Sequence, residues 1–338
     1  MIARARQFLR IPRWARVAIS IALLALVLSR VDLFDLGQVL SAADLLMVAL
    51  LLCSVYGERI YSALRWHQVL KWSRAQIPLP VVIRLSFIAA FAGLFLPGAV
   101  GAEAIRVVGL ARYSANLAMA FSSVLIERMI AVLTLAPLVL VGLAFAPAEM
   151  PPAIRVTAWL AFAGVIALAF LLLHAWPRRL LAVVMPARLA RLCLPRLERL
   201  YTALGAYTAR PSMFAFALLL GLGFQVLRVI VVWLSALAVG IDVPLAYHFM
   251  FAPIIALVSM APISLAGIGV REAAYVYLFS FVNVPAEQAL AASVLVQFTG
   301  LLSCLPGAIV YTRESRLRHD AADECRQDAE GETACVRS

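Results

Sequence analysis

The stretch from 93 to 112, GLFLPGAVGAEAIRVVGLAR, constrains this chain most, because it is apolar enough for a membrane yet contains Pro97, four glycines, Glu103 and Arg106. Helix breakers leave backbone amides and carbonyls unpaired, which lipid tolerates only where protein or a water-filled cavity surrounds them. An ionisable side chain at membrane depth is costly and usually faces the interior of a helix bundle. The stretch is therefore interpreted as a broken membrane helix that forms half of a binding site.

The composition predicts an all-α polytopic membrane protein. The chain has 338 residues, of which 64% are hydrophobic, and a mean hydropathy of +0.96, far above the roughly 45–50% apolar content of soluble domains. Its apolar runs are long, unbroken and rich in Leu, Ala and Val, as in membrane helices. The formal charge of +11 comes from basic residues in loops beside these runs, where they orient spans. No nucleic-acid partner is expected.

Basic residues near both ends of the chain predict the side of the membrane that each end faces. Residues 1–16 carry five arginines and no acid before a short apolar run at 17–29. No A-x-A-like cleavage site follows that run, so it is interpreted as an uncleaved first span. Arginines also follow the last apolar run, which ends near Tyr311. Because basic loops face the cytoplasm, both termini are predicted to be cytoplasmic.

Two apolar stretches, 81–112 and 247–284, are too long to be single crossings. The first has 32 residues, near 48 Å as one helix at about 1.5 Å per residue, against a bilayer core of about 30 Å. The basic loop from 177 to 210 contains seven arginines and one glutamate, and it is cytoplasmic only if the first stretch turns back at Pro97–Gly98. The same reasoning makes the second stretch enter and leave from the outer face.

These crossings predict about six full spans plus two broken or re-entrant hairpins, or eight to ten helical membrane segments in two inverted repeats. Residues 1–312 are expected to form one transmembrane domain, with 313–338 as a disordered cytoplasmic tail. Half one is placed at about 17–147 and half two at about 153–312, joined by a cytoplasmic basic linker at 177–211. The hinge positions in the two broken helices are predicted at Pro97, Gly98, Gly101, Pro262, Gly267 and Gly269.

An internal repeat supports this division. Residues 88–106, IAAFAGLFLPGAVGAEAIR, resemble residues 254–273, IIALVSMAPISLAGIGVREA, and SSVLIER at 122–128 resembles ASVLVQF at 292–298. The predicted topology opens the first hairpin to the cytoplasm and the second to the outside, so the halves would be inverted. Inverted repeats with broken helices are the architecture of secondary transporters, which bind substrate where the broken helices meet.

Charged residues next to these breaks predict a binding site for an anion. Glu103 and Arg106 are three residues apart, so they share a helix face and can pair. An arginine fork binds two phosphate oxygens, and a helix N-terminus adds partial positive charge. An anionic lipid headgroup is thus the expected partner, and neighbouring carboxylates could carry a coupling proton. The candidate substrate-binding residues are Glu103, Arg106, Glu127, Arg128, Gln225, Arg228, Arg271 and Glu272.

Two other interpretations remain open for these charges. The pairs could be structural salt bridges between helices, and Glu58, Arg59 and Arg84 are expected to extend to the membrane interface. A membrane-embedded glycosyltransferase, or an accessory factor in lipid-linked glycan assembly, is the alternative function, with Glu103 or Glu127 as base. A transporter is favoured because the chain has no H-E-x-x-H, no glycine-rich phosphate loop and no cysteine spacing typical of a metal site. No cofactor and no metal are expected.

Four motifs carry a resemblance to a known family: RWHQVL at 65–70, FLPGAVGAEAIR at 95–106, IER at 126–128 and PISLAGIGVRE at 262–272. In these the chain resembles the membrane domain of lysylphosphatidylglycerol synthases and its stand-alone, flippase-like relatives. The resemblance implies an integral protein of the bacterial inner membrane, in a family whose bifunctional members flip aminoacylated phosphatidylglycerol.

The chain extends about 26 residues beyond its last span, without the cytoplasmic aminoacyltransferase domain of the bifunctional members, so synthesis of lysyl-lipid is not expected. The prediction is a lipid flippase or translocase that moves an anionic headgroup between leaflets. The resemblance leaves phospholipid and polyprenyl phosphate both open as cargo.

Overall fold

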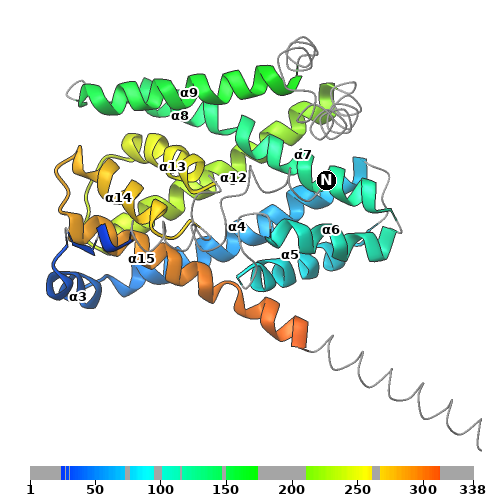
Figure 1. Ribbon diagram of the computed structural model, residues 1–338, viewed down its shortest axis with the longest axis horizontal. Helices are drawn as coiled ribbons and strands as arrows, with labels where there is room; N and C mark the ends of the chain where they lie inside the picture. Colours follow the sequence, from blue (N-terminus) through cyan, green and yellow to red (C-terminus); the bar gives the residue numbers. More distant parts are fainter. Residues whose placement is uncertain are drawn as a thin grey trace, which may run out of the picture.

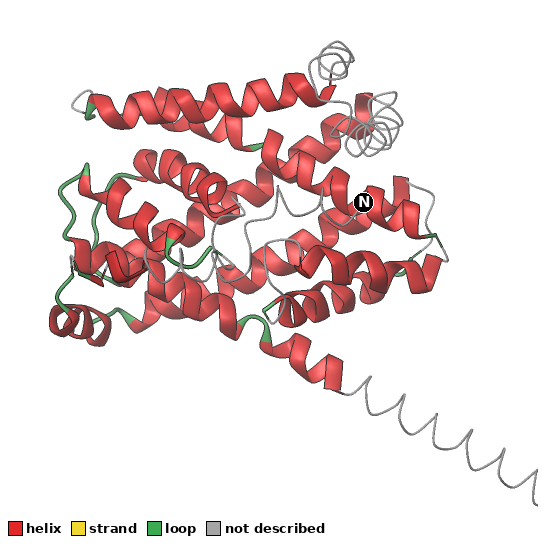
Figure 2. Ribbon diagram, in the orientation of Figure 1, coloured by secondary structure: helices red, strands yellow, loops and turns green. Residues whose placement is uncertain are grey.

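The computed structural model describes residues 24–26, 28–29, 31–72, 77–94, 101–114, 116–146, 150–173, 211–260 and 267–312. Within these ranges the regular structure is entirely helical (Figure 2), which confirms the predicted all-α class. The helices are α3 (Leu33–Ser41), α4 (Leu45–Trp72), α5 (Leu79–Gly93), α6 (Gly101–Ser114), α7 (Leu117–Leu133), α8 (Leu135–Ala144), α9 (Pro152–Leu173), α12 (Pro211–Ala238), α13 (Leu245–Met260), α14 (Val270–Ser280) and α15 (Ala286–Leu302). Residues 305–312 continue α15 as a further helical segment.

Four of the described helical segments are long and apolar enough to cross a membrane. They are rich in Leu, Ala and Val, and a helix that is apolar on all sides belongs in a core or a bilayer. Three shorter apolar segments accompany them, at Leu79–Gly93, Pro152–Ala167 and Leu245–Met260. The number of crossings stays a prediction. The four long segments are Leu45–Trp72, Met119–Ala144, Ser212–Ala238 and Ala286–Thr312.

Helices α4 and α12, each of 28 residues, cross the centre of the molecule side by side (Figure 1). They run antiparallel, since the amide of Asp44 before α4 donates to the carbonyl of Ala238 at the end of α12, at 2.9 Å. Near the other end, Val69 of α4 shares an apolar cluster with Ala217 of α12. Gly223 allows a close approach in between, because a Cβ there would meet the ring of Tyr61.

The first predicted break falls between α5 and α6, which pack against each other as a helical hairpin. A Cβ on Gly93 would lie 2.8 Å from the Cβ of Ala102, so the absence of a side chain brings the two helices together next to the turn. Gly101 is the first residue of α6. Pro97 and Gly98 lie outside the described residues.

The second predicted break falls between α13 and α14. Gly267 and Gly269 have φ values of 80° and 82°, a backbone conformation that costs glycine nothing and other residues energy. The carboxylate of Glu272 accepts a hydrogen bond from the amide of Gly269 at 2.6 Å, which caps the start of α14. Pro262 lies outside the described residues.

One irregularity lies inside the long apolar segment Met119–Ala144, where α7 ends at Leu133 and α8 begins at Leu135. Thr134 joins them, and its hydroxyl donates to the carbonyl of Ile130 at 2.8 Å. A threonine that bonds to its own helix competes with the backbone ladder and often bends the helix, a local effect that apolar periodicity does not reveal.

The two halves contain helices of matching length and contact. Helices α7 and α15 both have 17 residues and end at a hydroxyl residue, Thr134 in one and Ser303 in the other. Helix α4 packs against α5 and α7, as α12 packs against α13 and α15. In addition, α7 contacts α12 and α15 contacts α4, so each half lies against the central helix of the other.

Two apolar clusters flank the middle of α4. The larger one joins Leu51 and Val55 to α8, α12, α13, α14 and α15. The second joins Trp66 and Leu70 to α5, α6 and α7. The polar side chains described below occupy the segment of α4 between these clusters. The predicted linker at 177–211, apart from Pro211 at the start of α12, and the predicted tail at 313–338 lie outside the described residues.

We expect Gly307→Ala to lower the thermal stability of the detergent-solubilised protein. A Cβ at Gly307 would lie against the backbone carbonyl of Phe87 and 2.9 Å from the Cβ of Phe91, and overpacking of this kind costs about 1–3 kcal/mol. Gly164→Ala is the matched control, because nothing lies within 4 Å of a Cβ there. Equal melting temperatures for the two variants would contradict the close packing of residues 305–312 on α5.

Candidate functional site

A cavity of about 370 Å³ lies where α4, α7 and α12 meet α6, α13, α14 and α15. Its size is at the lower end of the range of ligand pockets in proteins, roughly 300–1,000 Å³. Six arginines and two glutamates line it, an excess of four formal positive charges. These charged residues are Arg59, Arg65, Arg106, Arg128, Arg228, Arg271, Glu58 and Glu127.

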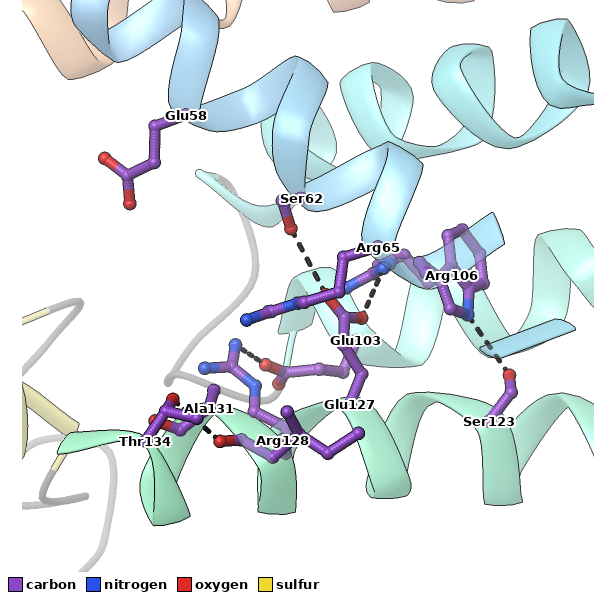
Figure 3. Close-up of polar contacts among 12 residues, drawn as sticks. Glu58, Ser62, Arg65, Glu103, Arg106, Ser123, Glu127, Arg128, Ala131 and Thr134 are labelled. Atoms are coloured by element: carbon purple, nitrogen blue, oxygen red, sulfur yellow. Dashed lines mark hydrogen bonds and ion pairs between the residues drawn. The ribbon is translucent and has the colours of Figure 1, made fainter. Parts of the chain in front are cut away.

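The carboxylate of Glu127 on α7 is the centre of the buried charges (Figure 3). Its Oε1 accepts hydrogen bonds from Nη2 of Arg65 at 3.0 Å and from the hydroxyl of Ser62 at 3.2 Å. Its Oε2 lies 2.5 Å from Nη2 of Arg106, in an ion pair rather than an aligned hydrogen bond. The side chains of Glu127 and Arg65 are both 4% exposed, so α4, α6 and α7 are joined by charges that water does not screen.

Aromatic rings cover the faces of the two buried guanidinium groups. The Cζ of Arg65 lies 4.3 Å from the ring centroid of Phe224, and the Cζ of Arg106 lies 4.0 Å from that of Trp66. Trp66 is fixed in turn by a hydrogen bond from its Nε1 to the hydroxyl of Ser123, at 3.2 Å. Cation–π contacts partly replace the hydration that an arginine loses on burial, and they leave the donor-bearing edges of both groups for other partners.

The predicted pairing of Glu103 with Arg106 is wrong, because each residue pairs with α7 instead. Glu103 pairs with Arg128, and Arg106 pairs with Glu127. Residues three apart share one face of α6, and that face packs against α7, so the oppositely charged partners on the neighbouring helix are nearer.

Two matching contacts tie each central helix to the 17-residue helix of the other half. Arg59, the fifteenth residue of α4, donates from Nε to the hydroxyl of Ser303 at 2.5 Å and from Nη2 to the carbonyl of Gly300 at 3.1 Å. Gln225, the fifteenth residue of α12, donates from Nε2 to the carbonyl of Ala131 at 2.5 Å. It also lies 3.5 Å from the hydroxyl of Thr134. Both contacts are therefore made at the end of the 17-residue helix.

Of the other predicted site residues, some line the cavity and others have a structural role. Arg228 lies 3.4 Å from Glu58, and Arg271 donates to Gln297 at 2.5 Å. Both arginines line the cavity. Glu272 is buried but caps α14, and neither it nor Glu103 is among the lining residues.

Four polar lining residues were missed or misplaced by the sequence reasoning. Glu58 and Arg59 were expected at the membrane interface, yet both line the cavity, as do Ser62 and Arg65. Residues at these three- and four-residue spacings lie along one side of a helix, so a polar stripe within an apolar run was the available signal. Arg65 lies among basic and tryptophan residues at the end of α4, a composition that is also typical of an anchor at the membrane interface.

The arrangement can bind an oxyanion. Arginine offers up to five N–H donors in a planar fork that matches phosphate oxygens. Buried donors are present here: Nε and Nη1 of Arg65 and Nε of Arg106 have no acceptor within the part of the chain that the structure describes. That part also contains no cluster of three or more His, Cys, Asp or Glu side chains placed to hold a metal.

A comparison with protein families matches residues 13–307 to the family described as Lysylphosphatidylglycerol synthase TM region. The chain belongs to this family. The match confirms the resemblance seen in the four motifs. Together with its long apolar helices, membership makes the chain an integral membrane protein and points to a function related to membrane lipids. No curated protein matches the sequence.

We expect Glu127→Gln to destabilise the protein by about 3–5 kcal/mol, the cost of leaving a buried charge without its partner. Both Arg65 and Arg106 would lose their counter-charge. Glu58→Gln is the matched control, because its partner Arg228 is 37% exposed and exposed pairs contribute about 0–1 kcal/mol. Thermal unfolding of the two variants in detergent measures the difference. Equal losses would show that Glu127 is not an essential counter-charge.

Proposed function

We propose that this protein is a flippase-like translocase that moves an anionic lipid headgroup, of a phospholipid or a polyprenyl phosphate, between membrane leaflets. The observation that carries the proposal is the excess of arginine in a cavity inside a membrane protein. An uncompensated charge within a helix bundle is expensive and marks an ion or substrate pathway by default. A phosphate group supplies the missing negative charge and accepts the geometry of the arginine fork.

In this proposal the arginines hold the phosphate and the carboxylates place them. Arg106, Arg128 and Arg271 were predicted as ligands, and the cavity adds Arg59 and Arg65. Glu127 holds Arg65 and Arg106, Glu103 holds Arg128, and Gln297 holds Arg271. Arg59 is held by Ser303 and Gly300. Guanidinium groups that share a carboxylate, as Arg65 and Arg106 share Glu127, can exchange it for phosphate oxygens, and the released carboxylate could take up a coupling proton.

The matching halves support movement by alternating access. Helices α4 and α12 are equal in length and antiparallel, as an inverted repeat requires, and they meet at the cavity. Inverted repeats that meet at a central site are typical of secondary transporters. We assign the halves to 17–147 and 153–312, with both termini in the cytoplasm of a bacterium and the domain in its inner membrane.

A membrane glycosyltransferase is the rival function, and the ion pairs disfavour it. Glu127 contacts two arginines and Glu103 contacts one, and a carboxylate stabilised in its charged form is a weak general base. Membranes that contain the protein, incubated with labelled sugar donors, would yield a new glycolipid only if the rival is correct.

We expect Arg228→Gln and Arg271→Gln to slow the movement of fluorescent anionic lipids in proteoliposomes, each by about tenfold or more, which corresponds to one lost charge-assisted hydrogen bond. Arg155→Gln is the matched control, because Arg155 is exposed on α9 and outside the lining residues. Unchanged transport in both folded cavity variants would make these arginines structural. The absence of transport by the unmodified protein, with and without a proton gradient, would refute the translocase itself.

The proposed topology predicts opposite labelling of the tail and of the loop before α13. In a background without other cysteines, Cys325 should react with a membrane-impermeant thiol reagent only in inside-out vesicles, since basic segments face the cytoplasm. A cysteine introduced by Asp242→Cys should react only in right-side-out vesicles. Labelling of both positions from the same side would overturn the topology.

A further inference from the structure

We infer that the headgroup bound in the arginine cavity is a dianion, a phosphate monoester or a diphosphate, rather than the monoanionic phosphodiester of an ordinary phospholipid. The inference rests on the proposed function and narrows its substrate class. It comes from the way in which the charges of the cavity are paired.

Two of the six arginines contact a carboxylate of their own, and a third precedes a glutamate in the chain. Arg228 lies next to Glu58, and Arg128 pairs with Glu103. Arg271 donates to Gln297, and it is followed in the chain by Glu272, whose buried carboxylate caps α14. Counting Glu272 against Arg271 gives the smallest excess of charge that the cavity can have. In this count, none of these three arginines adds to the excess positive charge of the cavity.

The remaining three arginines share a single carboxylate. Arg65 and Arg106 both contact Glu127, so one of their two charges is uncompensated. Arg59 is held by neutral acceptors: the hydroxyl of Ser303, the carbonyl of Gly300 and the sulfur of Cys304, at 2.5, 3.1 and 3.2 Å. At least two positive charges therefore remain, on side chains that line one cavity.

A ligand with two negative charges neutralises this excess, whereas a ligand with one leaves a guanidinium charge uncompensated inside the bundle. A phosphate monoester carries about −1.5 to −2 near pH 7 and presents three terminal oxygens. A phosphodiester carries one charge and presents two such oxygens. The unfilled donors on Arg65 and Arg106 give the additional oxygen a partner once the side chains turn toward the ligand.

Phosphate monoester chemistry has two sources, a lipid headgroup and free inorganic phosphate. The full-length protein in detergent is mixed with equal amounts of phosphatidic acid and phosphatidylglycerol of identical acyl chains, and bound lipid is counted by native mass spectrometry. Inorganic phosphate is then added as competitor. We expect about a tenfold preference for phosphatidic acid, the effect of one more charge-assisted contact, and little displacement by inorganic phosphate.

Variants that remove a positive or a negative charge from the cavity test whether its excess charge selects the dianion. Arg59→Gln removes one uncompensated charge and should reduce the preference for phosphatidic acid to about threefold or less. Glu58→Gln leaves the charge of Arg228 uncompensated, so the preference for phosphatidic acid should stay the same or increase. Arg155→Gln, which changes a charge on the exposed surface of α9, should leave it unchanged. Because each variant is scored on the ratio of two bound lipids, a partial loss of folded protein does not change the result.

The outcomes separate this inference from the function on which it rests. Equal binding of the two lipids, or a preference for phosphatidylglycerol, overturns the dianion and leaves the translocase standing. Binding of inorganic phosphate without phosphatidic acid supports the dianionic site but removes the lipid as its source, and with it the translocase. Binding of none of the three probes overturns both.

Discussion

The buried carboxylate of Glu127, shared by two arginines, is the interaction on which the central part of the structure depends. It joins α4, α6 and α7 at a point where the neighbouring surfaces are apolar. Removing charges from water costs several kcal/mol per ion, and well-packed apolar residues often replace a buried ion pair without loss of stability. Stability alone therefore gives a weak reason for three charged side chains here, while exchange of the carboxylate for a ligand gives a strong one.

The hydrogen bonds of Arg59 and Gln225 connect the two halves in the same region, at the ends of α15 and α7. Each side chain reaches from the central helix of its own half to the end of the 17-residue helix in the other half. In the proposed transport cycle, α4 cannot move against α15, nor α12 against α7, without breaking a hydrogen bond at the point where that helix already ends. Arg59 also lines the cavity, so an anion that attracts it would loosen one of the two contacts and leave the other in place.

Local chemistry explains which features could be predicted from the sequence. The helical class and the breaks before Gly101 and around Gly267 follow from composition and from residues that act on their own backbone. Which charges pair depends instead on which helix faces meet, and periodicity within one helix does not contain that information. Glu103 therefore forms its ion pair with Arg128 rather than with Arg106. The irregularity at Thr134 is hidden for a related reason, since a single hydroxyl among apolar residues does not indicate whether the helix continues regularly.

The charge of the cavity also bears on the cargo of the proposed translocase. An aminoacylated phosphatidylglycerol carries at least one ammonium group beside its phosphodiester, so its headgroup is neutral or cationic. Six arginines against two glutamates would repel that ammonium, and repulsion of the wrong ligand is as effective a source of specificity as attraction of the right one. A cavity suited to aminoacylated lipid needs a carboxylate free to meet the amine, whereas Glu58 and Glu127 already contact arginines. Under the proposed function, the ratio of arginine to glutamate around this cavity therefore favours an anionic headgroup over an aminoacylated one.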